Sequence, residues 1–128
     1  MDGDQVRVVA ERTFDSRVDS VREARHFAEA VVLGTGADPA TTALLTSEIA
    51  TNAVLHARTP FRVRVIEGSD HVRVEISNDE PELLLAMKDA SEHGGRGLRI
   101  VDQLASHWGA ESSRGDKVVW FELRRLSD

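Results

Sequence analysis

The 128-residue sequence contains no cysteine, which excludes disulfides and metal sites with thiolate ligands. Its five histidines form no H-E-x-x-H arrangement, so a metal site built from protein ligands alone is not expected. No apolar run approaches the ~20 residues needed to cross a bilayer. Met1 is followed by an acidic, polar stretch that does not resemble a signal peptide, and we therefore expect a cytoplasmic protein with no membrane partner.

Basic residues are in the minority. The sequence has 16 Lys and Arg against 22 Asp and Glu, a formal net charge of -6 and a pI of about 5.3. Such a chain repels the phosphate backbone of nucleic acids, so we expect no direct nucleic-acid binding. Domains of about 100–150 residues are common, and we expect a single domain over residues 1–128.

The first half of the chain shows a strand followed by two helices. Apolar and polar residues alternate over residues 6–14, which predicts a first strand. The Ser-x-x-Asp pattern from Ser16 to Asp19 predicts a helix start, and this helix should end near Gly34. Asp38 and Pro39 are typical of an N-cap and a first helical position, so a second helix is predicted over residues 39–57.

The second half is dominated by strands. Alternating residues predict a hairpin of strands 61–65 and 72–76, and a second hairpin of strands 108–113 and 117–124. Between the hairpins lie a possible short helix at 82–90, a glycine cluster and a helix at 98–107. Strands grouped in hairpins favour an α+β sandwich of two layers, in which helices cover one face of a mixed sheet.

Glu48, Asn52 and His56 follow one another at intervals of four residues on the second predicted helix. Their side chains should form one polar strip beside the apolar face. This strip has two interpretations. It can be an ordinary solvated face, or it can be a magnesium–phosphate site, because an amide oxygen ligates hard cations and a carboxylate accepts protons.

The segment GGRGL at residues 94–98 directly precedes the third predicted helix. Glycines let backbone N–H groups approach a phosphate, and a helix N-terminus adds partial positive charge. A flexible loop that leads into a helix is the alternative interpretation. The segment fits neither the G-x-x-x-x-G-K-[ST] motif nor a dinucleotide-binding fingerprint.

Taken together, residues 48–57 (EIATNAVLHA) and the GGRGL segment resemble the N box and the second glycine box of GHKL ATPases. The resemblance is strongest to the anti-sigma-factor serine kinases of Gram-positive bacteria, and the order of the predicted elements agrees with the GHKL fold. It implies ATP and Mg²⁺ as cofactors. It also implies a sigma factor and a STAS-domain anti-anti-sigma factor as partners, and a homodimer.

The same resemblance assigns roles to individual residues. Glu48 would be the general base for the target serine, and Asn52 would ligate the Mg²⁺ held by the triphosphate. His56 would support the end of the helix, and residues 81–93 would form a lid over the nucleotide. Gly95 and Gly97 would admit the phosphates, with Arg96 nearby as a charge partner, and Leu98 would belong to the same nucleotide-binding segment.

Two positions depart from the family pattern. The family usually has an aspartate that accepts a hydrogen bond from the adenine amino group, where this chain has Asn78, with Asp79 as a substitute if the register shifts by one. A threonine that helps to bind adenine is replaced by Val118, which cannot make that hydrogen bond. We therefore expect ATP to bind less tightly or less selectively than in typical members. The pattern leaves open which face of the last strand is buried.

Three functions follow from these observations. The first is an anti-sigma regulator that binds ATP·Mg²⁺, sequesters a sigma factor and phosphorylates a serine of a STAS-domain partner. The second is a partner-binding anti-sigma protein with weak or vestigial nucleotide binding and no kinase activity. The third is the ATPase domain of a sensor histidine kinase, which would need a dimerisation hairpin that carries a phospho-accepting histidine. His26 lies on the first predicted helix, but we expect this chain to have no room for such a hairpin.

Overall fold

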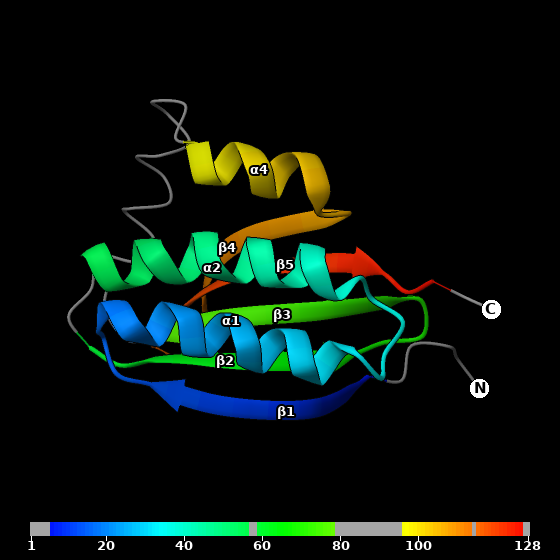
Figure 1. Cartoon of the computed structure of the whole chain (residues 1–128), viewed down its shortest axis with the longest axis horizontal. Coiled ribbons are helices and arrows are strands. Elements are labelled where there is room, and N and C mark those ends of the chain that lie inside the picture. The colour runs from blue at the N-terminus through cyan, green and yellow to red at the C-terminus, as the bar shows by residue number, and fades with distance from the viewer. Residues whose placement is uncertain (1–5, 57–58, 79–95, 114, 127–128) are drawn as a thin grey trace.

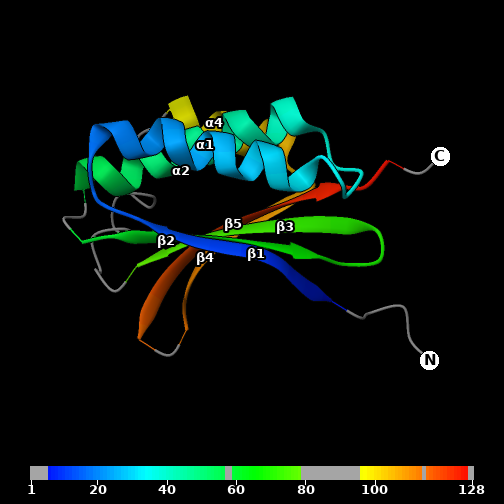
Figure 2. The same ribbon diagram turned by 60° about the horizontal axis from the view of Figure 1, so that its bottom comes forward.

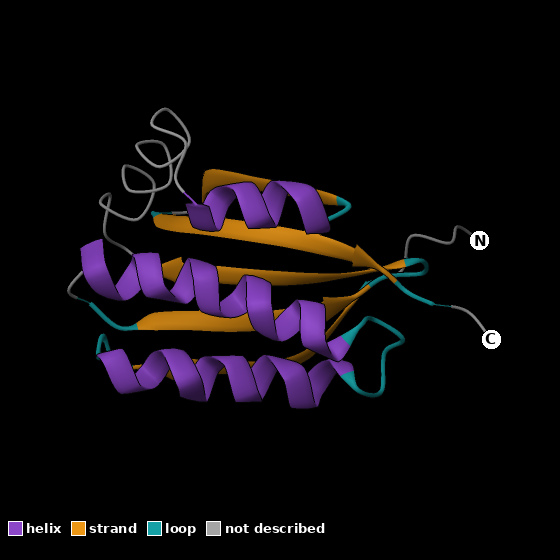
Figure 3. Cartoon of the chain, turned by 45° about the horizontal axis from the view of Figure 1, so that its top comes forward, coloured by secondary structure: helices purple, strands orange, loops and turns teal. Residues whose placement is uncertain are grey.

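The computed structural model describes residues 6–56, 59–78, 96–113 and 115–126. In these residues one sheet carries three helices on one of its faces (Figures 2 and 3). The elements follow in the order β1 (Arg7–Phe14), α1 (Val18–Val32), α2 (Pro39–His56), β2 (Phe61–Glu67), β3 (His71–Asn78), α4 (Arg96–Leu104), β4 (His107–Ser113) and β5 (Asp116–Arg124). The predicted α+β sandwich is confirmed, whereas the possible short helix at 82–90 lies outside the described residues.

The strand order in the sheet is β1-β2-β3-β5-β4, and every pair of neighbouring strands described is antiparallel. The prediction of a mixed sheet was therefore wrong. Two helices lie between β1 and β2, so the chain reverses direction between them. β5 lies between β3 and β4, which would otherwise be parallel neighbours, and it runs antiparallel to both.

The core lies between the sheet and the helices. Alternation along the strands turns every second residue toward the helix layer, and these residues are almost fully buried: Phe61, Val63, Val65, Val72, Val74, Ile76, Val119, Phe121 and Leu123. The buried face of the last strand is thus the face of Phe121. Figure 2 shows the opposite face of the sheet without a helix over it.

The second helix begins as the sequence predicts. The Asp38 Oδ2 atom accepts hydrogen bonds from the Thr41 backbone N–H, at 3.0 Å, and from the Thr41 hydroxyl, at 2.6 Å. The Thr41 hydroxyl and backbone bonds lower the pKa of Asp38 from its ordinary value of 3.8, because they stabilise the charged carboxylate. Asp38 is therefore a true N-cap.

The first helix begins one residue later than predicted. Arg17 is its N-cap, with extended backbone angles and no side-chain capping bond, so Ser16 lies one position too early for that role. The reason is a local turn, in which the Arg17 N–H donates to the Asp15 carbonyl oxygen at 2.9 Å. The Ser16–Asp19 pattern was thus correct about the existence of the helix but not about its cap.

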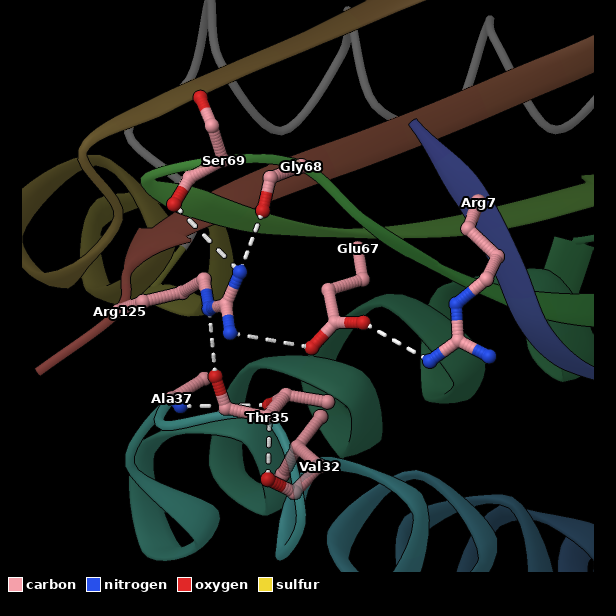
Figure 4. A network of polar contacts seen from close by, with 8 residues as sticks. All are labelled: Arg7, Val32, Thr35, Ala37, Glu67, Gly68, Ser69 and Arg125. Atoms are coloured by element: carbon pink, nitrogen blue, oxygen red, sulfur yellow. Dashed lines mark hydrogen bonds and ion pairs between the residues drawn. The ribbon is translucent and has the colours of Figure 1, made fainter. Parts of the chain in front are cut away.

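One arginine ties together three segments at the end of the sheet where β5 finishes (Figure 4). Arg125 Nε donates to the Thr35 carbonyl oxygen at 2.7 Å, and Nη1 donates to the Gly68 carbonyl oxygen at 2.7 Å. Its Nη2 atom lies 3.3 Å from a carboxylate oxygen of Glu67. The α1–α2 turn, the β2–β3 turn and the C-terminal segment are thereby held together, away from the end of the molecule where α2 finishes.

Candidate functional site

The ends of three elements lie at the end of the molecule opposite Arg125. Figure 1 shows the C-terminal turns of α2, the last residues of β3 and the first turn of α4 at the same end. α2 lies between α1 and α4 and contacts both. The sequence motifs from the predicted helices and the hairpin therefore lie at one end of the fold.

Glu48 and Asn52 lie on one flank of α2. The stripe of α2 that faces the sheet contains Leu45, Ile49 and Ala53, all buried. Glu48 and Asn52 are partly buried, one turn apart, at the edge of this stripe. Both side chains therefore lie at the boundary between core and solvent, whereas the side chain of His56 lies outside the part of the chain that the structure describes.

The Glu48 carboxylate carries no ion pair and no hydrogen bond from any residue that the structure describes. Nearby polar side chains of α2 bond to the backbone of the helix instead, as the Thr51 hydroxyl does in donating to the Ser47 carbonyl oxygen at 2.7 Å. A partly buried carboxylate that no described side chain engages is available to a ligand. This is the property that a general base requires.

Asn78 is the last residue of β3 and only 6% exposed. Its side chain lies on the helix-facing side of the sheet, because it continues the alternation of Val74 and Ile76. A carboxamide at this place can both donate and accept hydrogen bonds. Asp79, the predicted substitute, lies outside the described residues.

Lys117 is a candidate residue that the sequence patterns did not single out. In the antiparallel pairing of β3 with β5, Lys117 lies directly opposite Asn78. It shares the helix-facing side with Val119 and Phe121, which follow at intervals of two. The spacing indicates which side of the strand Lys117 occupies, and the register with β3 places it opposite the buried amide.

Val118 lies on the opposite side of the sheet. It is paired with Ser77 and lines an open cavity of about 380 Å³ together with Arg62 and Arg64. The structure therefore does not bring Val118 together with Asn52 or Asn78. The residues around the cavity form ion pairs among themselves, such as Arg62 with Asp116 at 3.6 Å and Arg64 with Glu75 at 3.8 Å.

The glycine segment is described in part. Arg96, Gly97 and Leu98 form the first turn of α4, whereas Gly95 lies outside the described residues. The first N–H groups of a helix have no partner within the helix and carry partial positive charge. The start of α4 is therefore suited to a phosphate group.

The described residues contain no group of three or more His, Asp or Glu side chains able to hold a metal ion. Asn52 fits a Mg²⁺ ion delivered by a triphosphate, because such an ion keeps phosphate and water ligands and takes only one or two from the protein. The partly buried position of Asn52 beside Glu48 fits this requirement.

Among the residues that the structure describes, no helix is long and apolar enough to cross a membrane.

The chain matches the family model of the histidine kinase-like ATPase domain over residues 14–123. The matched region extends from the last residue of β1 to the second-last residue of β5, and thus includes all three described helices. No curated protein shows significant similarity to the sequence.

Proposed function

The chain belongs to the histidine kinase-like ATPase domain family, and from this premise we propose that it binds ATP·Mg²⁺ and phosphorylates a serine of a protein partner. The observation that carries the proposal is the pair Glu48 and Asn52, partly buried and one turn apart in the C-terminal half of α2. This half of α2 leads to the end of the fold where α4 begins (Figure 1). Family membership supports ATP binding and phosphoryl transfer in general. The residues around the site support the more specific role.

The nucleotide would lie between α2, α4 and the end of β3. An α-helix is right-handed, so its direction decides which flank faces which neighbour. With the sheet behind α2 and α4 beside it (Figure 1), we infer that the flank of Glu48 and Asn52 is turned toward α4. The phosphates would then meet the first turn of α4, and the base would approach Asn78.

Each residue would have a distinct task in the reaction. Asn52 would hold Mg²⁺, which neutralises charge on the phosphate oxygens. Glu48 would accept the proton of the serine hydroxyl. The serine oxygen would form a bond to the γ-phosphorus, and the bond between the γ-phosphorus and the oxygen that bridges to the β-phosphate would break. The products are phosphoserine and ADP. Gly97, at the start of α4, would let the backbone approach the phosphates.

The solvent side of α2 favours a protein as the phosphoryl acceptor. Leu44 and Leu55 are 39% and 67% exposed and lie on this side, one before and one after Glu48. Glu48 is the only acidic or basic residue among the 18 residues of α2, apart from the terminal His56. An uncharged surface with exposed leucines around a carboxylate suits a partner that brings both apolar contacts and a hydroxyl group.

We propose that this acceptor is a STAS-domain anti-anti-sigma factor and that the competing partner is a sigma factor. The support is the resemblance of residues 48–57 and 94–98 to the anti-sigma-factor kinases. A cytoplasmic homodimer is part of the same proposal. Because transcription control by such a protein needs no DNA contact, the net charge of -6 is compatible with it.

A second candidate is a partner-binding anti-sigma protein in which nucleotide binding is weak and kinase activity is absent. Two observations favour it. Asn78 is a neutral residue where a carboxylate would accept more strongly, and Val118 lies on the sheet face opposite to Asn78. Neither observation affects Glu48 or Asn52.

Titration calorimetry with ATP·Mg²⁺ separates the two candidates. The first predicts saturable binding that Asn52→Ala abolishes, and no binding up to millimolar ATP would select the second. A phosphorylation assay with a STAS-domain protein then tests the reaction. Glu48→Gln should retain nucleotide binding and lose serine phosphorylation, and full activity of Glu48→Gln would exclude the assigned base.

A further inference from the structure

We propose that Asn78 and Lys117 together make the base-binding end of the site accept guanine nucleotides at least as well as adenine nucleotides. This inference rests on the proposed function, since it assumes that the base of the nucleotide approaches the end of β3. The preference for one purine over the other would be set by the side chains of Asn78 and Lys117. The argument depends on their pairing, their burial and their hydrogen-bonding groups.

The two residues form one cross-strand pair. Asn78 and Lys117 are opposite each other in the antiparallel register of β3 and β5, on the helix-facing side. Directly opposite residues have Cβ atoms about 4.5–5.5 Å apart, so a ligand that touches one side chain is within reach of the other. A base that contacts the Asn78 amide would therefore also meet the Lys117 ammonium group.

The Asn78 amide alone does not distinguish adenine from guanine. Its oxygen accepts and its NH₂ group donates, and rotation of the amide exchanges the two positions. Adenine presents an amino donor beside a ring-nitrogen acceptor. Guanine presents a carbonyl acceptor beside a ring N–H donor. Both edges match an amide in one of its two orientations. A carboxylate, which only accepts, can bind the amino group at position 6 of adenine but not the carbonyl oxygen at position 6 of guanine, which offers donors only at N1 and N2.

The Lys117 ammonium group distinguishes the two purines. An ammonium group only donates hydrogen bonds, and it carries a positive charge. It can bind the O6 atom of guanine, which is an acceptor, but it cannot bind the amino group at the same position of adenine. The pair thus offers more donors than acceptors to the base, and this arrangement favours a purine with a carbonyl group at position 6.

The surroundings of Lys117 leave its charge available. Among the described residues, no carboxylate lies within ion-pair distance of its Nζ atom, whose closest acceptor is the Gly115 carbonyl oxygen at 3.5 Å. The neighbouring carboxylate of Asp116 is on the other side of the strand and lies 3.6 Å from Arg62. A bond of 3.5 Å is at the outer limit of hydrogen bonding, so Lys117 can exchange it for a ligand.

Calorimetric titration of the full chain with ATP, GTP and ITP, each with Mg²⁺, tests the inference. We expect GTP to bind at least as tightly as ATP. ITP should behave like GTP, because both carry the O6 atom that Lys117 recognises. Lys117→Met, which keeps the length of the side chain and removes the donor, should weaken GTP binding about tenfold and change ATP binding much less.

Two further variants are compared with wild type in the same titration. Asp116→Asn removes a charge on the opposite side of the same strand and should leave the ratio of the two dissociation constants unchanged. The double variant Asn78→Asp with Lys117→Met removes both donors that could bind O6, and it should shift the ratio of the two dissociation constants at least tenfold toward ATP relative to wild type. Circular dichroism checks that each variant is folded.

The possible results separate the inference from the proposed function. If wild-type protein binds ATP more tightly than GTP, or if Lys117→Met weakens both nucleotides equally, the inference on base preference is wrong while nucleotide binding stands. If neither ATP nor GTP binds to folded wild-type protein, the proposed function fails and this inference fails with it.

Discussion

Arg125 and Thr35, ninety positions apart in the sequence, are joined by a 2.7 Å hydrogen bond from Nε to the Thr35 carbonyl oxygen. Thr35 is 4% exposed and lies in the turn between the two long helices, whereas Arg125 follows the last strand. The same guanidinium reaches the Gly68 carbonyl oxygen and Glu67. Three connections of the fold thus depend on one side chain at the end opposite the proposed site.

Replacement of Arg125 should destabilise the domain without affecting nucleotide binding. Each hydrogen bond contributes about 0.5–1.5 kcal/mol net, and a carbonyl left without its donor adds a desolvation cost. We expect Arg125→Ala to lower the free energy of unfolding by about 2–3 kcal/mol, and Arg125→Lys to lose part of this, because lysine cannot present the guanidinium fork. Urea denaturation measures both values. The exposed neighbour Arg124→Ala is the control, with an expected change within about 0.5 kcal/mol. An equal loss in both alanine variants would refute the assigned role.

Stability in acid should depend on Asp38. The bonds from Thr41 lower the pKa of Asp38 in the folded state relative to its ordinary value of 3.8. A lowered pKa means that the charged carboxylate stabilises the fold above the unfolded-state pKa, and that this contribution is lost as the pH falls through the folded-state pKa. The stability difference between wild type and Asp38→Asn should therefore be constant well above pH 3.8 and shrink below it.

Thermal denaturation of both proteins across that range gives the measurement. Asp38→Ala, which removes the cap altogether, should cost about 1 kcal/mol at neutral pH. A difference between wild type and Asp38→Asn that grows as the pH falls would contradict the sign of this linkage.

Much of the fold could be predicted from the sequence because its signals are local. Alternation along β2 and β3 depends only on residues two apart, and the Asp38–Pro39 start of α2 depends on a single turn. The mixed sheet was a wrong prediction because strand order is a long-range property. No local pattern indicates that β5 is inserted between β3 and β4.

The site was predictable in the same uneven way. The spacing of Glu48 and Asn52 is a local helical signal, and the structure places both at the edge of the buried stripe. The position of Val118 required knowledge of which face of β5 is covered, and this depends on the helices packed against Phe121. Lys117 was missed for the same reason, since its importance comes from a partner on β3, 39 positions earlier in the sequence.

The exposed leucines of α2 should affect the protein substrate and not the nucleotide. Leu55 is 67% exposed and lies two turns beyond Glu48 on the solvent side. If the STAS-domain partner packs there, Leu55→Lys should raise the KM for that protein about tenfold, the value of one buried aliphatic side chain. The Kd for ATP should be unchanged. Leu126→Lys, equally exposed at 70% but beyond β5, is the matched control. A common effect of both substitutions on KM would argue against a docking surface on α2.

Gly109 should contribute to stability because it leaves space for the Trp120 ring on the face of the sheet that no described helix covers. A Cβ atom at this position would lie 2.8 Å from the Trp120 ring. That ring is held in place, because its Nε1 atom donates to Glu111 at 2.9 Å and the Arg73 guanidinium lies 3.9 Å from the ring centroid. Gly109→Ala must therefore displace the indole or the strand, and overpacking of this kind costs about 1–3 kcal/mol. Gly34→Ala is the matched control, since nothing lies within 4 Å of a Cβ atom there. Chemical denaturation monitored by tryptophan fluorescence should show a lowered midpoint and an altered native signal for Gly109→Ala alone. An unchanged midpoint would mean that Trp120 moves aside freely and that its contacts with Arg73 and Glu111 contribute little to stability.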